Sequence, residues 1–316
     1  MLRELDIWRC AIVKRAAAQI SQADLTLDKL LWLPSPRQFA YRADPFGLWL
    51  DGNLHIFVEA FDHRTLKGSI ELLVYDESFK LVGQQMALSK PWHLSYPFVF
   101  PADDQIWMLP EARRSGELTL YRAREFPDEW EAAGVLEVPG DAVDATPLYH
   151  DDKWWLFYAR VGRNAASNSE LNLAYADCLI GPWRLHPLNP VRTGLRGTRP
   201  AGTPVHRADG GIDLPVQDCS RTYGGSVRRL VIRTLNERQF DAEDLPWLEP
   251  APALGPLLEG LHTLSAAGDV TLIDCKSVDR SLLGMFARQR GSLVRRLRAW
   301  SPPVATVPLG RKPARG

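Results

Sequence analysis

The chain has 316 residues, of which 45% are hydrophobic and 24% charged, an ordinary globular composition that excludes a disordered or collagen-like chain. Lys and Arg together number 38 and Asp and Glu 38, so the formal net charge is zero. A neutral chain argues against binding to nucleic acid or to an anionic membrane that is steered by overall charge. The 11 tryptophans suit a sheet-rich core, with sugar stacking as a secondary use.

Residues 1–40 predict a closing strand at about 7–13 and then a loop with Pro34 and Pro36. Residues 1–20 carry scattered charges and no continuous apolar core, so we expect neither a signal peptide nor, anywhere in the chain, a transmembrane segment. The four cysteines are widely scattered and lack metal-ligand spacing. They predict reduced thiols, no zinc site and a cytoplasmic location.

Five segments between residues 41 and 276 share one layout: an opening motif, a strand, a polar turn and a second strand. Their equivalent positions are separated by 52, 48, 55 and 63 residues and are occupied by Asp44, Tyr96, Asp144, Arg199 and His262. Further strands are expected at 69–75, 117–122, 170–175 and 227–234. A period near 50 residues with three or four short strands per unit is typical of a propeller. We therefore predict an all-β, five-bladed β-propeller over residues 41–276, because a two-sheet sandwich would not explain five similarly spaced motifs.

Residues 277–316 predict a short C-terminal helix at 277–299 followed by a flexible basic tail. The basic run 288–298 continues into a Pro-rich tail that contains Arg311, Lys312 and Arg315. One interpretation is a solvated helix face and a frayed terminus. The other is a weak peripheral contact with an acidic surface or an anionic membrane.

Acidic side chains recur at the positions that a propeller brings to its axis. Asp44 precedes Pro45, and Asp144 precedes Thr146 and Pro147 two units later, whereas either Asp alone would be read as a turn cap. Glu111 ends the second strand of the second unit. Glycosidic chemistry commonly needs two carboxyl groups, and neighbouring carboxylates keep one of them protonated near neutral pH. We predict an acidic funnel with Asp44, Glu111 and Asp144 as its catalytic candidates.

Other polar side chains are expected around the same funnel mouth as substrate ligands. Arg199 suits either an anionic sugar or an ion pair with one of the aspartates. For the histidines, a structural hydrogen bond is the alternative. The predicted substrate-binding residues are His93, Tyr96, Arg199, Gln217, Asp218, Tyr223 and His262.

Motifs for other chemistries are absent from the sequence. It contains no GxGxxG or GxxxxGK[ST] phosphate loop, no GxSxG nucleophile elbow and no HExxH metal motif. We therefore expect no cofactor, no metal and no nucleic-acid partner, and a carbohydrate or glycoconjugate substrate.

The ordered series ADPF, HLSYPF, LPEA, DATP with WWLFYA, GPW with HPLNP, RPAG, QDCS with YGG, and LHTL resembles one known family over about residues 40–275. It is the N-terminal domain of the glucosamine inositolphosphorylceramide transferases, within the five-bladed superfamily of arabinanases, levansucrases and invertases. The resemblance implies a sugar site at the funnel mouth, Asp44 as nucleophile or base, and Asp144 as the carboxylate that tunes the acid or stabilises the transition state.

The sequence departs from that pattern in two ways. Where arabinanases carry a glutamic acid late in a blade, the third unit reads Tyr158-Ala159-Arg160, so Glu111 or Asp218 would have to act as the acid. The plant transferases also carry a separate glycosyltransferase domain, and we expect none within these 316 residues. The sequence therefore favours hydrolysis or transfer of a glycosidic bond. The alternatives are a non-catalytic carbohydrate-binding or accessory domain and a purely structural interaction propeller.

Overall fold

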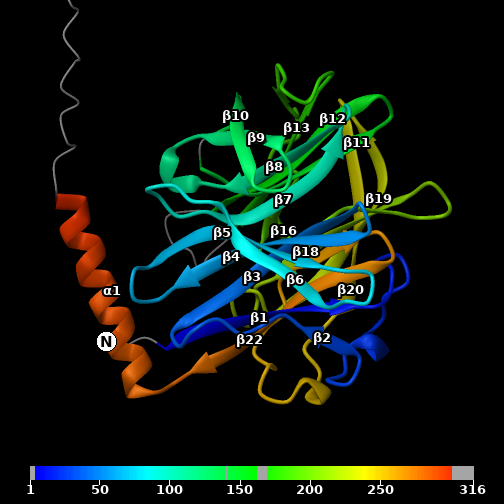
Figure 1. Cartoon of the computed structure of the whole chain (residues 1–316). Helices are drawn as coiled ribbons and strands as arrows, with labels where there is room; N and C mark the ends of the chain where they lie inside the picture. Colours follow the sequence, from blue (N-terminus) through cyan, green and yellow to red (C-terminus); the bar gives the residue numbers. More distant parts are fainter. Residues whose placement is uncertain (1–3, 140, 162–168, 301–316) are drawn as a thin grey trace, which may run out of the picture.

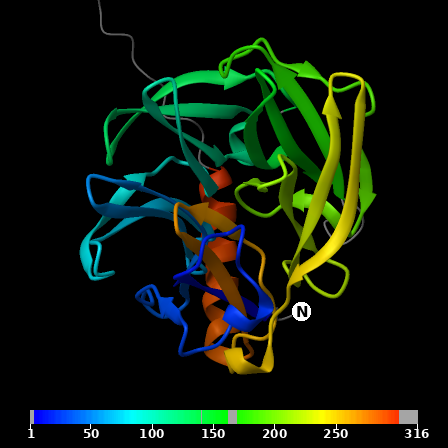
Figure 2. The same cartoon turned by 90° about the vertical axis from the view of Figure 1, so that its right-hand side faces the viewer.

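The computed structural model describes residues 4–139, 141–161 and 169–300, and the side chains of 161 and 294–300 are not described. Five antiparallel sheets stand side by side around a common axis (Figure 1) and form a ring when viewed along it (Figure 2). The predicted all-β, five-bladed propeller is therefore confirmed. The first two blades in chain order are four-stranded meanders in which consecutive strands pair, and the third and fourth each include a fifth, short strand that pairs off the main strand order. In these four blades the first strand is innermost, whereas the fifth blade combines strands from both ends of the chain.

The first four blades follow the chain order. The first blade contains β3 (Ala40–Leu50), β4 (Asn53–Asp62), β5 (Lys67–Tyr75) and β6 (Leu81–Leu88). The second contains β7 (Ser95–Ala102), β8 (Gln105–Glu111), β9 (Leu118–Glu125) and β10 (Glu129–Leu136). The third contains β11 (Ala142–His150), β12 (Lys153–Val161), β13 (Ser169–Ala176), β14 (Arg184–Leu185) and β15 (Arg192–Gly194). The fourth contains β16 (Arg196–Pro200), β17 (Val205–His206), β18 (Ile212–Asp218), β19 (Ser226–Asn236) and β20 (Gln239–Leu248).

The fifth blade joins the two ends of the ring. It combines β21 (Leu264–Ala267) and β22 (Val270–Asp279) with β1 (Leu5–Val13) and β2 (Leu30–Trp32) from the start of the chain. β1 pairs with β22 without interruption, from Leu5 opposite Asp279 to Val13 opposite Thr271. Backbone hydrogen bonds between the first and last strands thus close the ring.

A β-bulge interrupts the innermost strand in each of the first three blades. The bulges lie after Ala43, Ser95 and Val143, and Asp44, Tyr96 and Asp144 adopt positive φ angles of 50°, 45° and 51°. A bulge re-aims a side chain and bends its strand. Asp44 is the fifth residue of β3, which begins at Ala40, and the bulge is what presents its side chain.

The hydrophobic core lies between neighbouring blades. Separate clusters of buried side chains fill these interfaces, for example Trp107, Leu109 and Trp154 between the second and third blades. Trp155 and Trp183 are buried as well, whereas Trp92 is only partly buried against another cluster. The expectation that these tryptophans are mainly core holds, because each packs against the next sheet rather than lining the axis.

One α-helix, α1 (Leu282–Trp300), follows the last blade and lies across one face of the ring, behind its centre in Figure 2. The prediction that this helix begins at 277 is wrong, because Ser277, Val278 and Asp279 continue the ladder of β22 with β1. The remaining described helices are single 3-10 turns, at Gln22–Asp24, Arg113–Ser115 and Pro252–Leu254. No helix among the described residues is long and apolar enough to cross a membrane. The basic tail with Arg311, Lys312 and Arg315 lies outside the described residues.

Candidate active site

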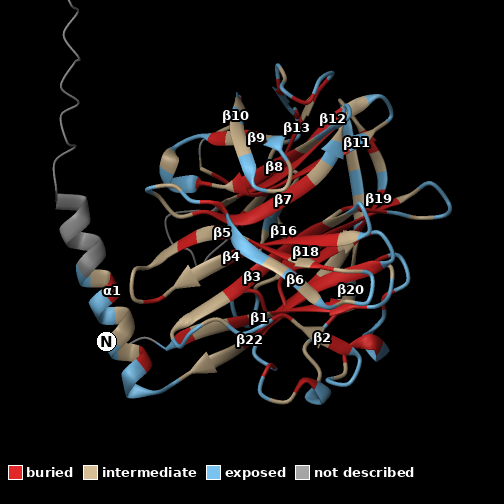
Figure 3. Ribbon diagram, in the orientation of Figure 1, coloured by how far each residue is buried: buried red, intermediate tan, exposed pale blue. Residues whose placement is uncertain are grey.

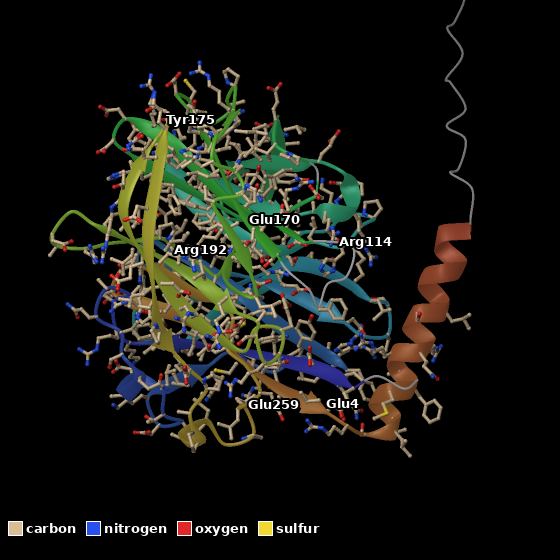
Figure 4. The ribbon with its side chains drawn as sticks, turned by 180° about the vertical axis from the view of Figure 1, so that it is seen from behind. Glu4, Arg114, Glu170, Tyr175, Arg192 and Glu259 are labelled. Carbon is tan, nitrogen blue, oxygen red and sulfur yellow. The ribbon has the colours of Figure 1, made fainter. Side chains whose placement is uncertain are left out.

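A cavity of about 780 Å³ opens at the end of the ring that α1 crosses. Four carboxyl groups line it: Asp44, Glu59, Glu111 and Asp144, from β3, β4, β8 and β11. His93, Arg199 and Tyr223 line the same cavity. Arg114 also lines it and lies on the flank that faces α1 (Figure 4). All three predicted catalytic residues, Asp44, Glu111 and Asp144, therefore line the same cavity.

Asp44 is held at the floor of this cavity by protein donors. Its Oδ1 accepts from the Thr263 hydroxyl at 3.0 Å, and its Oδ2 accepts from the backbone N–H of Tyr96 at 3.1 Å. Burial raises the pKa of Asp44 to about 6, with His262 opposing the rise and Asp274 and Asp144 adding to it. At neutral pH, Asp44 is therefore mostly ionised, and a small decrease in pH protonates it.

His262 lies directly behind Asp44 and is buried rather than exposed to the cavity. Its Nδ1 donates to the Asp274 carboxylate at 2.8 Å, its Nε2 lies 3.5 Å from Asp44 Oδ1, and its ring stacks on Trp8 at 3.8 Å between centroids. Burial lowers the pKa of His262, but the two carboxylates outweigh it and the net shift is upward. His262 thus supports Asp44 from behind and does not line the cavity, and its predicted contact with a sugar stays a prediction.

Asp44, His262 and Asp274 also present donor atoms within 4.8 Å of one another, a spacing that a metal ion could bridge. The Asp274 carboxylate already accepts the backbone N–H groups of Asp44, His262 and Thr263 in addition to the imidazole. These bonds satisfy the donors and acceptors of the cluster without an ion. The predicted absence of a metal stays a prediction.

Glu111, Asp144 and Arg199 form the opposite wall. Arg199 Nη2 lies 2.6 Å from Asp144 Oδ2, which is the ion pair that the sequence left as one of two possibilities. Burial raises the pKa of Glu111 to about 8, and the nearby Asp144 charge and a hydrogen bond shared with it add to the rise, against the opposing effect of Arg199. Glu111 is therefore protonated at neutral pH and has a carboxylate partner to hold its proton.

Glu59 is a further buried carboxyl group that the sequence analysis missed. It occupies the register position of Glu111 one blade earlier, because Ala43 pairs with Glu59 as Ser95 pairs with Glu111. Burial, and then the Asp44 charge, raise the pKa of Glu59 well above its usual range. The signal was the matched pair Val58-Glu59-Ala60 and Pro110-Glu111-Ala112 in the repeat.

His93 lies beside Glu59, with 3.5 Å between His93 Nε2 and Glu59 Oε1. Burial lowers the pKa of His93 to about 4, and Arg114 lowers it further, so the imidazole is neutral. Its Nδ1 accepts the backbone N–H of Gly68 at 2.8 Å, which leaves the proton on Nε2, the atom nearer to Glu59. His93 can therefore donate a hydrogen bond into the cavity.

Besides His262, three more predicted ligands do not line the cavity, namely Tyr96, Gln217 and Asp218. Tyr96 is buried, and its hydroxyl pairs with Thr146 Oγ1 at 2.9 Å and accepts the Gly202 N–H at 2.7 Å. Gln217 is buried beneath Asp144, 3.4 Å from its Oδ2. Asp218 pairs with Arg196 at 3.4 Å and with Arg228 at 3.9 Å. Their polar atoms are engaged by protein groups, and their predicted contact with a sugar stays untested.

The fold and site define a class: a five-bladed propeller with a carboxylate-lined axial cavity. A solved family 117 glycoside hydrolase from Zobellia galactanivorans shares this fold with a TM-score of 0.52 and 16% identity over 75% of this chain and 85% of that one. A β-1,2-mannobiose phosphorylase from Listeria innocua matches with a TM-score of 0.54 and 9% identity over 86% and 96%. Identities this low show the fold alone.

The chain belongs to the family described as glucosamine inositolphosphorylceramide transferase 1, N-terminal, whose model matches residues 2–251. A glucosamine inositolphosphorylceramide transferase 1 from Oryza sativa subsp. indica is 36% identical over 205 residues, 63% of this chain and 27% of the relative. The Arabidopsis thaliana protein of that name is 32% identical over 212 residues, 66% and 27%. The chain thus spans about a quarter of the length of these relatives.

Proposed function

We propose that this propeller is a carbohydrate-active domain that hydrolyses or transfers a glycosidic bond in a glycan or glycoconjugate. The observation that carries the proposal is that Asp44, Glu111 and Asp144 line one cavity in different surroundings, in which burial raises the pKa of Asp44 to about 6 and that of Glu111 to about 8. Between those values one carboxyl group is ionised and the other protonated. This is the division of labour that glycosidic chemistry requires.

In the proposed mechanism, Glu111 is the general acid that protonates the leaving oxygen. Asp144, fixed by Arg199 at 2.6 Å, holds the Glu111 proton and stabilises the positive charge that develops on the sugar ring. Asp44 is the nucleophile, or the base that activates water or an acceptor hydroxyl. Arg199, Tyr223 and His93 supply hydrogen bonds to the substrate from the cavity wall.

Glu59 is the second candidate for the acid. It lines the same cavity, its pKa is raised, and the neutral His93 lies beside it. Glu111 is preferred because Asp144 can accept its hydrogen bond and stabilise the carboxyl proton in a fixed position. The two assignments predict different effects of substitution. If Glu111 is the acid, Glu111→Gln removes the loss of activity at alkaline pH, and if Glu59 is the acid, Glu59→Gln removes it.

A second function, a non-catalytic carbohydrate-binding or accessory domain, is favoured by a specific observation. Both oxygens of Asp44 already accept hydrogen bonds from the protein, and the residue is only 7% exposed. Each of these bonds draws electron density from its oxygen and so weakens Asp44 as a nucleophile or base, although a second lone pair stays available. The same bonds do not impair a carboxylate that only shapes the cavity.

The experiment that separates these functions compares wild type with Asp44→Asn on defined oligosaccharides and activated sugar donors. Asparagine keeps the size of the side chain and tolerates positive φ, but it cannot act as a base or nucleophile. Loss of a general base typically costs about 100- to 10,000-fold in kcat. Asp51→Asn is the matched control, because Asp51 is exposed in a turn with a φ of 49°.

Turnover that survives Asp44→Asn undiminished would show that the hydrolase or transferase assignment is wrong. Sugar binding by calorimetry in a protein that turns over none of the substrates would instead support the binding domain.

A further inference from the structure

The outward face of α1 carries an unusually exposed apolar stripe. Leu282, Leu283, Phe286 and Leu293 are 66%, 69%, 59% and 59% exposed. At 100° per residue, positions 282, 286 and 293 fall within one narrow stripe and 283 lies at its edge. Single exposed apolar side chains are ordinary, but a contiguous stripe on one helix face indicates a binding surface.

The opposite face of the same helix is fixed against the propeller, so the orientation of the stripe is not free to vary. Gly291 is buried, and a Cβ at this position would lie 2.2 Å from the His63 carbonyl oxygen, which shows a close approach of the helix to the ring. Arg288 donates to the Glu4 carbonyl at 2.8 Å. Glu4 lies beside the start of α1 (Figure 4), and burial on α1 is confined to the side that meets the ring (Figure 3).

One flank of α1 contributes to the cavity that holds the carboxyl groups. Met285, Arg288 and Ser292 line the cavity from that flank, and Gln289, which lies among the stripe residues, lines it as well. The stripe therefore borders the cavity mouth. Whatever binds the stripe is placed beside the entrance to the cavity.

The sequence around the stripe is strongly basic in a chain with no net charge. Residues 281–316 contain eight Lys or Arg residues and no Asp or Glu. Arg290, which is exposed, falls on the helix surface next to Phe286 and Leu283. Apolar side chains flanked by arginines are typical of helices that lie in the interface of an anionic membrane.

We propose that α1 binds an anionic lipid surface through this stripe and so holds the cavity mouth at the level of the lipid headgroups. This membrane contact goes beyond the proposed function and does not depend on turnover. A second copy of the chain is a poorer occupant, because two such basic faces would repel each other.

Vesicle co-sedimentation tests the proposal with the full chain. Wild type should pellet with vesicles of phosphatidylcholine mixed with phosphatidylserine, less with phosphatidylcholine alone, and less again in high salt. Leu283→Asp combined with Phe286→Asp should weaken binding by tenfold or more, on the order expected for losing two buried apolar side chains. Arg290→Gln should weaken it by about fivefold.

Leu188→Asp is the matched control, because Leu188 is an apolar residue of comparable exposure, 51%, that lies off the helix and does not line the cavity. Helix content by circular dichroism, unchanged in every variant, shows that the exposed substitutions do not unfold α1.

Equal pelleting of the Leu283→Asp, Phe286→Asp variant and the Leu188→Asp control would overturn the proposal. So would wild-type binding that ignores phosphatidylserine, or the absence of vesicle binding. A dimer in analytical ultracentrifugation that the double substitution dissociates, without vesicle binding, would assign the stripe to self-association instead. None of these outcomes bears on Asp44→Asn turnover of soluble sugars, so the two proposals fail separately.

Discussion

At the scale of single residues, the site depends on carboxyl groups of one chemical type placed in different surroundings. Asp44 is opposed by the imidazole of His262, whereas Glu111 faces the carboxylate of Asp144 and shares a hydrogen bond with it. The first arrangement limits the rise in pKa that burial causes, and the second enlarges it. Asp44 and Glu111 therefore take different protonation states because their neighbours differ. A difference in exposure to solvent is not needed.

These surroundings predict a bell-shaped dependence of kcat/KM on pH. Activity should rise as Asp44 loses its proton through a pKa of about 6 and fall as Glu111 loses its proton through a pKa of about 8. Glu111→Gln should abolish the alkaline limb on substrates with good leaving groups, which need no acid. Glu59→Gln should leave that limb in place, and the reverse result for these two variants would assign the acid to Glu59.

The sequence predicted Asp44, Glu111 and Asp144 because the repeat places them at equivalent or complementary positions of different blades. The same repeat predicted Tyr96 as a substrate ligand, and Tyr96 shares the bulge position of Asp44 and its positive φ. A phenol at that position is long enough to reach the third and fourth blades, where Thr146 and Gly202 bond its hydroxyl. Whether the Tyr96 side chain can cross the axis depends on the distance between blades. That distance cannot be predicted from the number of residues that separate the repeats.

At the scale of structural elements, the innermost strands must approach one another closely at the axis. The clearest case is Gly202, whose N–H donates to Tyr96 and which forms a parallel bridge with Leu264 at the start of β21. Its φ is 135°, and a Cβ at this position would lie 1.7 Å from the Leu264 carbonyl oxygen. This position therefore requires glycine both for its backbone conformation and for the space.

We predict that Gly202→Ala destabilises the fold by more than about 3 kcal/mol, because backbone strain and a backbone clash add. Gly194→Ala is a matched control, since Gly194 has a φ of 131° and nothing within 4 Å of its Cβ position. The control should cost only about 1–2 kcal/mol from backbone strain. Urea unfolding of both variants measures the difference, and equal losses would mean that the Leu264 contact is relieved by a small shift.

The C-terminal helix shows where element prediction from sequence stops. Its apolar periodicity was visible, but its first residue was not, since Ser277, Val278 and Asp279 are held in strand by pairing with the far end of the chain. Tertiary pairing thus overrode the local pattern. The close packing of Gly291 against the ring fixes the rotation of α1, so that Arg288 faces the cavity and Phe286 faces solvent. The apolar periodicity of the sequence does not reveal this packing.

At the scale of the whole molecule, we expect the five blades to unfold cooperatively only if the ring is closed. Closure depends on β1, whose residues pair with β22 on one side and β2 on the other. Ile12 lies in the middle of this contact, fully buried among side chains of the first and fifth blades. A loss of packing there weakens the link between the two ends of the chain.

We predict that Ile12→Ala lowers the free energy of unfolding by about 2–5 kcal/mol, as expected for a cavity in a buried core. If closure couples the blades, amide hydrogen exchange should accelerate in β12 of the third blade as much as in β22, although β12 makes no contact with Ile12. Val82→Ala, on an exposed position of β6, should change neither. Faster exchange confined to the fifth blade would show that the blades open separately, and that the cavity can persist in a ring whose seam is open.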